Sequence, residues 1–124
     1  MELKILKCQK CGATVEVLKD CNCNDCGILC CKEVMTEMKA NSVDASFEKH
    51  VPQIETNGQM MKVFVNHVME EDHHIEWIGV FAENRFTKVF LRPQEKPEAI
   101  FHYSSGAKVF AFCNKHGLWT NEVQ

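Results

Sequence analysis

The chain of 124 residues has no apolar run that approaches the roughly 20 residues needed to span a bilayer. Its first eight residues are too few and too charged to form the apolar core of a secretion signal. It also lacks an excess of positive charge, because its formal net charge is -3, and this argues against a general nucleic-acid surface. We therefore expect a cytoplasmic protein that binds neither membranes nor nucleic acid.

Internal repeats, low-complexity tracts and helical patterns of normal length are missing as well. The hydrophobic fraction of 45% and the charged fraction of 25% are those of a globular protein. Short segments rich in β-branched and aromatic residues, separated by turn-forming residues, predict an antiparallel sandwich or barrel of about 80 residues. The clearest of these segments are Met61–Val65, Ile75–Phe81, Thr87–Leu91 and Lys108–Phe112.

The cysteines are unevenly distributed, since seven of the eight lie between Cys8 and Cys31. A secreted disulfide framework would spread them out, and a bond between the neighbours Cys30 and Cys31 would be strained. We therefore interpret them as reduced, metal-binding thiols. Residues 1–36 are too few to fold on a core alone, because units below about 40 residues normally need a metal or disulfides. The predicted domains are 1–36 and 37–124, the second beginning with a polar linker over 37–46.

The pattern Cys8-x-x-Cys11-Gly12 is typical of a metal knuckle, in which two thiolates share one turn. Cys30 and Cys31 offer two further ligands, and four thiolates suit zinc or a single iron. Spacing alone does not decide which four thiols bind.

Three more cysteines, Cys21, Cys23 and Cys26, lie in a loop of turn-forming residues. They could form a second small cluster, stay as exposed thiols without a fixed metal, or pair with one another under oxidation. All three alternatives are open at this point.

A second group of metal-ligand residues falls at strand ends and loops, which a sandwich gathers at one end. Four imidazoles and one thiolate fill five coordination positions and leave a sixth open, which favours redox chemistry over a structural site. A lone histidine is more often an ordinary core or surface residue, so the prediction depends on the residues occurring together. The group is His50, His67, His73, Cys113 and His116; His74 and His102 are left out of it.

Two charged residues, Glu48 and Lys49, stand directly before His50. A carboxylate there could reach an open metal position, and an ammonium group beside it would attract an anionic substrate. A thiolate ligand donates electron density to iron. The residues therefore suggest one-electron reduction of a small oxygen anion.

Three motifs carry a resemblance to superoxide reductase. They are Glu48-Lys49-His50-Val51-Pro52, the pair His67-x5-His73 followed by His74-Ile75, and Cys113-Asn114-Lys115-His116-Gly117-Leu118-Trp119. The Cys-rich front resembles the desulforedoxin-like domain of the two-iron form, desulfoferrodoxin. The resemblance implies a rubredoxin-like domain followed by an immunoglobulin-like β-sandwich, usually as a homodimer.

The resemblance also implies roles for single residues. Cys8, Cys11, Cys30 and Cys31 would hold the first iron, with zinc as an alternative, and the four histidines would surround the second iron with Cys113 axial. Glu48 would occupy the sixth position in the oxidised state, and Lys49 would attract superoxide. The implied enzyme reduces superoxide to hydrogen peroxide, with a rubredoxin-like protein as electron donor. The alternative is a non-catalytic electron-transfer protein, or a metal or redox sensor, that works through the thiol cluster.

Overall fold

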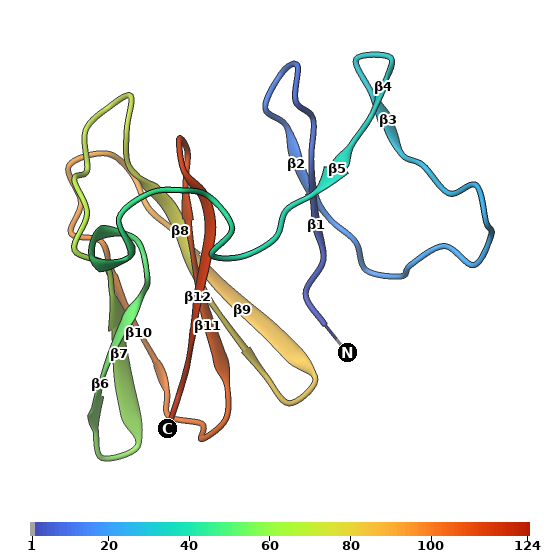
Figure 1. Ribbon diagram of the computed structural model, residues 1–124. Coiled ribbons are helices and arrows are strands. Elements are labelled where there is room, and N and C mark those ends of the chain that lie inside the picture. Colours follow the sequence, from blue (N-terminus) through green and yellow to red (C-terminus); the bar gives the residue numbers. More distant parts are fainter. Residues whose placement is uncertain (1) are drawn as a thin grey trace. The chain divides into compact units, whose positions relative to one another are not determined.

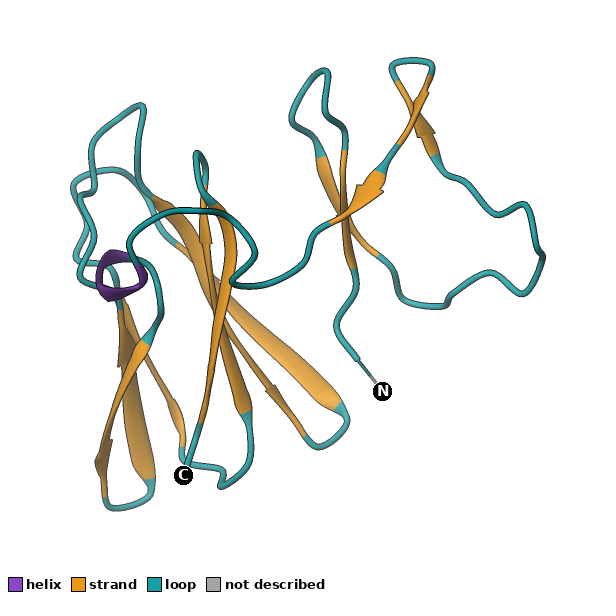
Figure 2. Ribbon diagram, viewed as in Figure 1, coloured by secondary structure: helices purple, strands orange, loops and turns teal. Residues whose placement is uncertain are grey.

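The computed structural model describes residues 2–124, which divide into two compact units, one ending at Lys39 and the other spanning Ala40–Gln124. The regular secondary structure of both units is almost entirely antiparallel strand (Figures 1 and 2). The one helix among the described residues is the short 3-10 helix η1, Phe47–Lys49. None of the described helices is long and apolar enough to cross a membrane. The predicted fold class, mainly β with a small Cys-rich segment in front, is confirmed.

The first unit contains a small three-stranded sheet and one separate hairpin. In the sheet, β1 pairs with both β2 and β5, and in the hairpin β3 pairs with β4. Leu6, Cys8 and Met35 form its small buried core. The strands are β1 (Ile5–Lys7), β2 (Thr14–Glu16), β3 (Leu29–Cys30), β4 (Glu33–Val34) and β5 (Thr36–Glu37).

Two tight turns present the cysteines of this unit. The amide of Gly12 donates to the Cys8 carbonyl at 2.9 Å, and the φ of +82° at Gly12 is one that L side chains rarely adopt. The β3–β4 hairpin turns through Cys31 and Lys32, whose φ angles are 53° and 67°. Two left-handed central residues are what a two-residue hairpin turn requires, although neither is glycine. This turn places the sulfurs of adjacent cysteines on one side of the hairpin.

The second unit is a sandwich of two antiparallel sheets, with strand orders β10-β7-β6 and β12-β11-β8-β9 (Figure 1). Alternate residues of both sheets face inward and form one buried core that includes Val63, Ile78, Val109 and Ala111. The strands are β6 (Gln53–Asn57), β7 (Met60–Phe64), β8 (Ile75–Ala82), β9 (Arg85–Phe90), β10 (Glu98–His102), β11 (Lys108–Cys113) and β12 (Gly117–Glu122).

The pairing of β11 with β8 has a register shift at the end of the sandwich where Cys113 lies. Phe112 pairs with Trp77, but Cys113 pairs with Ile75, so that Glu76 is skipped. The bulge turns the Ile75 side chain into the core and keeps the Glu76 carboxylate out of it. Cys113 continues the inward-facing series and is fully buried.

All four strands expected from the sequence are present, each shifted by one or two residues at an end. The expected polar linker differs from the structure, because Glu37 belongs to β5 and Asn41 is bound to strand β12. The Asn41 side chain accepts the Thr120 amide at 2.9 Å, and the backbone amide of Asn41 donates to the Leu118 carbonyl. Polar residues look like linker in a sequence, but here the asparagine satisfies backbone groups of an edge strand.

Candidate metal centres

The five residues of the predicted histidine–cysteine site come from four separate segments at one end of the sandwich. His50 directly follows η1, His67 follows β7, and His73 bridges to Glu70. Cys113 ends β11, and His116 lies in the β11–β12 turn. Their ligand atoms all lie within 4.8 Å of one another. In Figure 2 the helix η1 (purple) and the β11–β12 turn lie at the same end of the two sheets. The structure therefore brings together all five residues.

The four imidazole rings form a closed cycle. Ring centroids are 4.8 Å apart for His50 and His67, and 4.6 Å apart for His67 and His73. The cycle closes through His116, which is 5.2 Å from His73 and 4.8 Å from His50. Each ring is edge-on to its neighbours. Four nearly equal sides in this order describe a four-membered ring of imidazoles whose ligand atoms converge.

The hydrogen bonds of the rings decide which nitrogens face that centre. The Nδ1 atom of His50 lies 2.7 Å from the Ser46 carbonyl, and Nδ1 of His67 lies 2.6 Å from the Val68 carbonyl. A carbonyl only accepts, so each Nδ1 carries the proton and each Nε2 presents a lone pair. The Nε2 of His50 is 3.0 Å from Nδ1 of His116. Such backbone contacts are the usual outer support of metal-bound histidines.

His73 supplies an independent test of whether the site fits a metal. Its Nε2 atom is buried and has no hydrogen-bond partner among the described residues. An unsatisfied buried nitrogen is costly, by about 1–3 kcal/mol, unless something outside the protein binds it. Because the other ligand atoms converge on the same space, a metal cation satisfies this nitrogen and fits the donor set.

Cys113 lies against one side of the imidazole cycle. Its Sγ atom is 3.4 Å from Nε2 of His67 and 3.8 Å from Nδ1 of His116, and it accepts the His116 amide at 3.4 Å. Burial raises the pKa of the Cys113 thiol. Burial likewise lowers the pKa of His50, His67 and His73, which favours neutral imidazoles. A cation at the centre would lower the thiol pKa and keep the thiolate form that binds metal.

Trp119 supports two of the ligands from outside, a role that its position in the sequence did not reveal. It is fully buried, its indole stacks on the His50 ring at 4.8 Å, and its Nε1 donates to the His116 carbonyl at 3.0 Å. Phe47 packs edge-on against it at 5.3 Å. One side chain therefore fixes ligands that are far apart in the chain.

Asn114 links the two loops that carry His73 and His116, and sequence reasoning did not single it out. Its Oδ1 accepts the His74 amide at 2.9 Å, and its Nδ2 donates to the Asp72 carbonyl at 3.0 Å. These two bonds hold the backbone on both sides of His73. The role has no local sequence signal, because it depends on a contact between residues 40 positions apart.

Asn114→Ala is expected to lower the affinity for metal more than it lowers the stability of the fold. Loss of the two bonds frees the loop around His73, and losing an outer support of a metal ligand costs about 10–100-fold in metal affinity. Competition with a chelator measures this affinity. Asn114→Asp is the matched control, because it keeps the acceptor for the His74 amide and should fall between the variant and the native protein. Unchanged affinity in Asn114→Ala would remove the residue from this role.

The remaining residues of the motif lie at the edge of the site. Glu48 and Lys49 are both exposed, on η1 directly before His50. His74 donates from Nδ1 to the Glu70 carbonyl and is not part of the ligand group, and His102 lies exposed on β10. The two histidines left out of the predicted site are thus outside the ligand group.

The second candidate centre is the four-thiol group in the first unit, formed by Cys8, Cys11, Cys30 and Cys31, whose sulfurs lie within 4.8 Å of one another. The sulfurs of Cys11 and Cys30 are 3.6 Å apart. The amide of Cys11 donates to Cys8 and, as the main cause, lowers the pKa of that thiol to about 7. The thiols around Cys30 raise its pKa to about 12. Crowded sulfurs that resist joint ionisation fit a shared metal cation, which neutralises their charge.

Two of the three loop cysteines are not free thiols. Cys21 and Cys26 form a disulfide, while Cys23 is free and exposed. The interpretation of all seven N-terminal cysteines as reduced thiols is therefore wrong for this pair. The alternative of pairing under oxidation describes it instead.

Comparison with known proteins places the chain among relatives that share nearly its whole length. A protein called desulfoferrodoxin from Syntrophotalea carbinolica is 43% identical, with 98% of this chain and 97% of the relative covered. Another desulfoferrodoxin, from Desulfarculus baarsii, is 44% identical over 97% of this chain and 96% of the relative. The crystal structure of the superoxide reductase from Treponema pallidum matches with a TM-score of 0.74 at 25% identity, covering 98% and 100% of the two chains.

The family match falls on the unit that carries the histidine–cysteine site. Residues 42–122 match the family described as desulfoferrodoxin. This range contains the four histidines and the cysteine that gather at the end of the sandwich. The sequence match, the sandwich and the ligand group agree, and the chain belongs to the desulfoferrodoxin family.

Proposed function

We propose that this protein is a superoxide reductase that uses an iron held by four histidines and one cysteine. The observation that carries the proposal is the closed cycle of imidazoles with Cys113 against one side and an unsatisfied buried nitrogen on His73. Five donors leave one position of a six-coordinate metal for a small substrate. The similarity to a superoxide reductase over nearly the whole chain supports the same function.

In this proposal the ligands are His50, His67, His73, His116 and Cys113. Bound iron supplies the single electron that converts superoxide and two protons into hydrogen peroxide. The protein's own part is to hold the ligands and to shape access. The carbonyls of Ser46 and Val68 fix the tautomers of two rings, and Trp119 fixes the orientation of His50. The buried Cys113 provides electron density from a site that water does not reach.

Glu48 and Lys49 would control access to the open coordination position of the metal site. Both are exposed and precede a ligand, so their side chains are free to move beside the site. We assign to Lys49 the attraction of the superoxide anion, and to Glu48 a carboxylate that would cover the open side of the metal site in the oxidised enzyme. A local cation matters here because the chain as a whole carries a net charge of -3, which repels anions.

The proposal extends to the first unit and to partners. Cys8, Cys11, Cys30 and Cys31 would hold a second iron, with zinc as the chemically similar alternative. A rubredoxin-like protein would return the electron, and the enzyme would work in the cytoplasm as a homodimer. These assignments rest on the arrangement of the four thiols and on sequence similarity to the desulfoferrodoxins.

The product ratio tests the function directly. A reductase forms one hydrogen peroxide per superoxide and no oxygen, whereas a dismutase forms half as much peroxide and releases oxygen. The iron-loaded protein should therefore give a peroxide-to-superoxide ratio of one in the presence of a reductant. A non-catalytic electron carrier would leave the decay of superoxide unchanged, and a ratio of one half with oxygen release would also contradict the proposal.

Lys49→Ala is expected to slow superoxide capture by about tenfold at low salt and to weaken its dependence on ionic strength. The reason is that steering by a local charge is screened by salt. Stopped-flow kinetics across a salt series measures both effects. Arg85→Ala is the control, since it also removes one positive charge but from the first residue of β9, which pairs with Ala82 at the other end of strand β8 from Ile75. If both variants behave alike, Lys49 has no specific role.

A further inference from the structure

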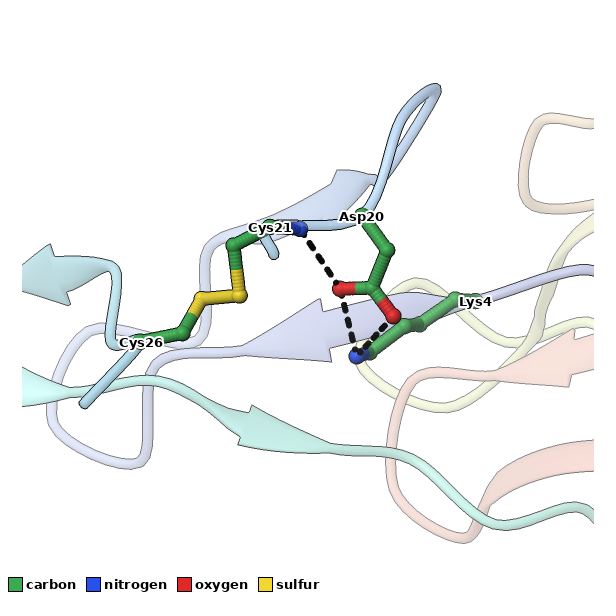
Figure 3. The surroundings of a disulfide bond; sticks show 4 residues. All are labelled: Lys4, Asp20, Cys21 and Cys26. Atoms are coloured by element: carbon green, nitrogen blue, oxygen red, sulfur yellow. Dashed lines mark hydrogen bonds and ion pairs between the residues drawn. A yellow bond between two sulfur atoms is a disulfide. The ribbon is translucent and has the colours of Figure 1, made fainter. Parts of the chain in front are cut away.

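The loop that joins β2 to β3 contains three cysteines that the proposed function does not use. The ligand atoms of Cys21, Cys23 and Cys26 lie within 4.8 Å of one another, and Cys21 and Cys26 are joined as a disulfide (Figure 3). All three residues are exposed. Cys23 is a free thiol, so the group combines a disulfide with a thiol close enough to attack it.

Few other contacts hold this loop in shape. Its flanking apolar side chains lie largely in solvent, with Leu18 86% and Ile28 46% exposed. An ion pair attaches the start of the loop to the residues just before β1. In it, the Lys4 ammonium lies 3.1 Å from the Asp20 carboxylate. The same carboxylate accepts the Cys21 amide at 3.0 Å (Figure 3). An exposed ion pair contributes little, so the disulfide is the main constraint on residues 21–26.

The disulfide is also open to small molecules. It lines a cavity of about 310 Å³ within the first unit, together with Lys4, Lys19 and Met35. Asp20 and Glu37 line the same cavity, so acidic and basic side chains balance around the bond. Thiolates are the form that reacts with peroxides and disulfides.

We propose that Cys21, Cys23 and Cys26 form a reversible redox switch, oxidised by hydrogen peroxide to the Cys21–Cys26 disulfide. One thiolate attacks a peroxide oxygen, the O–O bond breaks, and sulfenic acid and water form. The second thiol displaces the oxygen as another water, so that two thiols and one peroxide give one disulfide and two waters. An external dithiol reverses the step by exchange. Attack of Cys23 on Cys26 moves the bond to the pair Cys23-x-x-Cys26, which has the spacing of a redox pair, and frees the Cys21 thiol without net reduction.

The choice of peroxide rests on the proposed function, since superoxide reduction produces peroxide in the same molecule. Closing the disulfide also removes two thiols from competition with the four-thiol group. In the oxidised loop, Cys23 is the one described free thiol of this unit that lies outside the group of Cys8, Cys11, Cys30 and Cys31. Opening the disulfide adds two thiols to that of Cys23, in the segment that leads into β3 and Cys30.

Differential alkylation with mass spectrometry tests the switch on the full metal-loaded protein. Added hydrogen peroxide is the probe, so that the result does not depend on whether the protein reduces superoxide. After mild reduction, peroxide should remove two alkylatable thiols per chain, found as Cys21 linked to Cys26 with Cys23 alkylated. Dithiothreitol should restore both. Thiols that stay free under peroxide, or pairs with the four-thiol group, would overturn the proposal.

Two serine variants distinguish the roles of the three cysteines in disulfide formation. Cys26→Ser should abolish disulfide formation, because Cys26 belongs to both favoured pairs. Cys21→Ser should still lose two thiols, now as Cys23 linked to Cys26. If Cys26→Ser still loses two thiols under peroxide, or if Cys21→Ser loses none, the assigned pairing is wrong. Both positions are exposed, so neither variant removes a core side chain.

Discussion

Cys113→Ser should abolish superoxide reduction while the sandwich remains folded. Cys113 is fully buried, and its Sγ atom lies between His67 and His116 at one side of the imidazole cycle. A hydroxyl has nearly the volume of a thiol but is a hard, weakly donating ligand that stays protonated. We expect the rate with superoxide to fall by at least about 100-fold, because losing only an outer support costs 10–100-fold.

The rate is measured by rapid mixing or pulse radiolysis of the iron-loaded variant. Far-ultraviolet circular dichroism and metal content establish that the variant is folded and loaded. Cys23→Ser is the matched control, since it makes the same exchange at an exposed thiol in the other unit and should keep the native rate. A loaded Cys113→Ser protein with native turnover would refute the role of the thiolate as electron donor.

Trp119→Ala should cause the largest loss of stability among single substitutions near the site. The indole is fully buried, stacks on His50 and contacts Phe47. Replacing a buried tryptophan with alanine costs about 3–5 kcal/mol, through lost burial and the cavity left behind. The same change frees the His50 ring and the His116 carbonyl, so metal should also be released faster to a chelator.

Chemical unfolding of the metal-free protein isolates the packing part of this effect. Trp119→Phe is the informative comparison, because it keeps an aromatic ring near His50 but loses the hydrogen bond to the His116 carbonyl. That bond alone contributes about 1 kcal/mol. If Trp119→Ala changes the free energy of unfolding by less than about 1 kcal/mol, the indole does not support the site as described.

The sequence predicts the strands best where each has its own apolar pattern. Strand β11 contains a continuous apolar run over residues 109–113, and such a short run bounded by turn-forming residues is visible without a structure. Strand β6 is harder to find, because Gln53, Glu55 and Asn57 make it read as polar. It forms because β7 provides the pairing partner, and such tertiary pairing overrides local propensity.

The ligands of the histidine site could be proposed from sequence motifs, but the residues that hold those ligands in place could not. Asn114 and Trp119 act through contacts with residues distant in the sequence, so no local spacing signals them. Ser46 acts through its backbone carbonyl, which any residue type would provide. For the loop cysteines, the residues are evident in the sequence but their pairing is not. Three thiols within six residues have several possible states, and only the three-dimensional arrangement pairs Cys21 with Cys26.

The central claim is that iron lies among His50, His67, His73, His116 and Cys113. Anomalous scattering from crystals, recorded on both sides of the iron and zinc absorption edges, tests it most directly. We predict an iron peak within bonding distance of Nε2 of His73 and Sγ of Cys113, with a second metal peak among the four N-terminal thiols. A zinc peak at the histidine site, or no metal there in a fully loaded protein, would contradict the account.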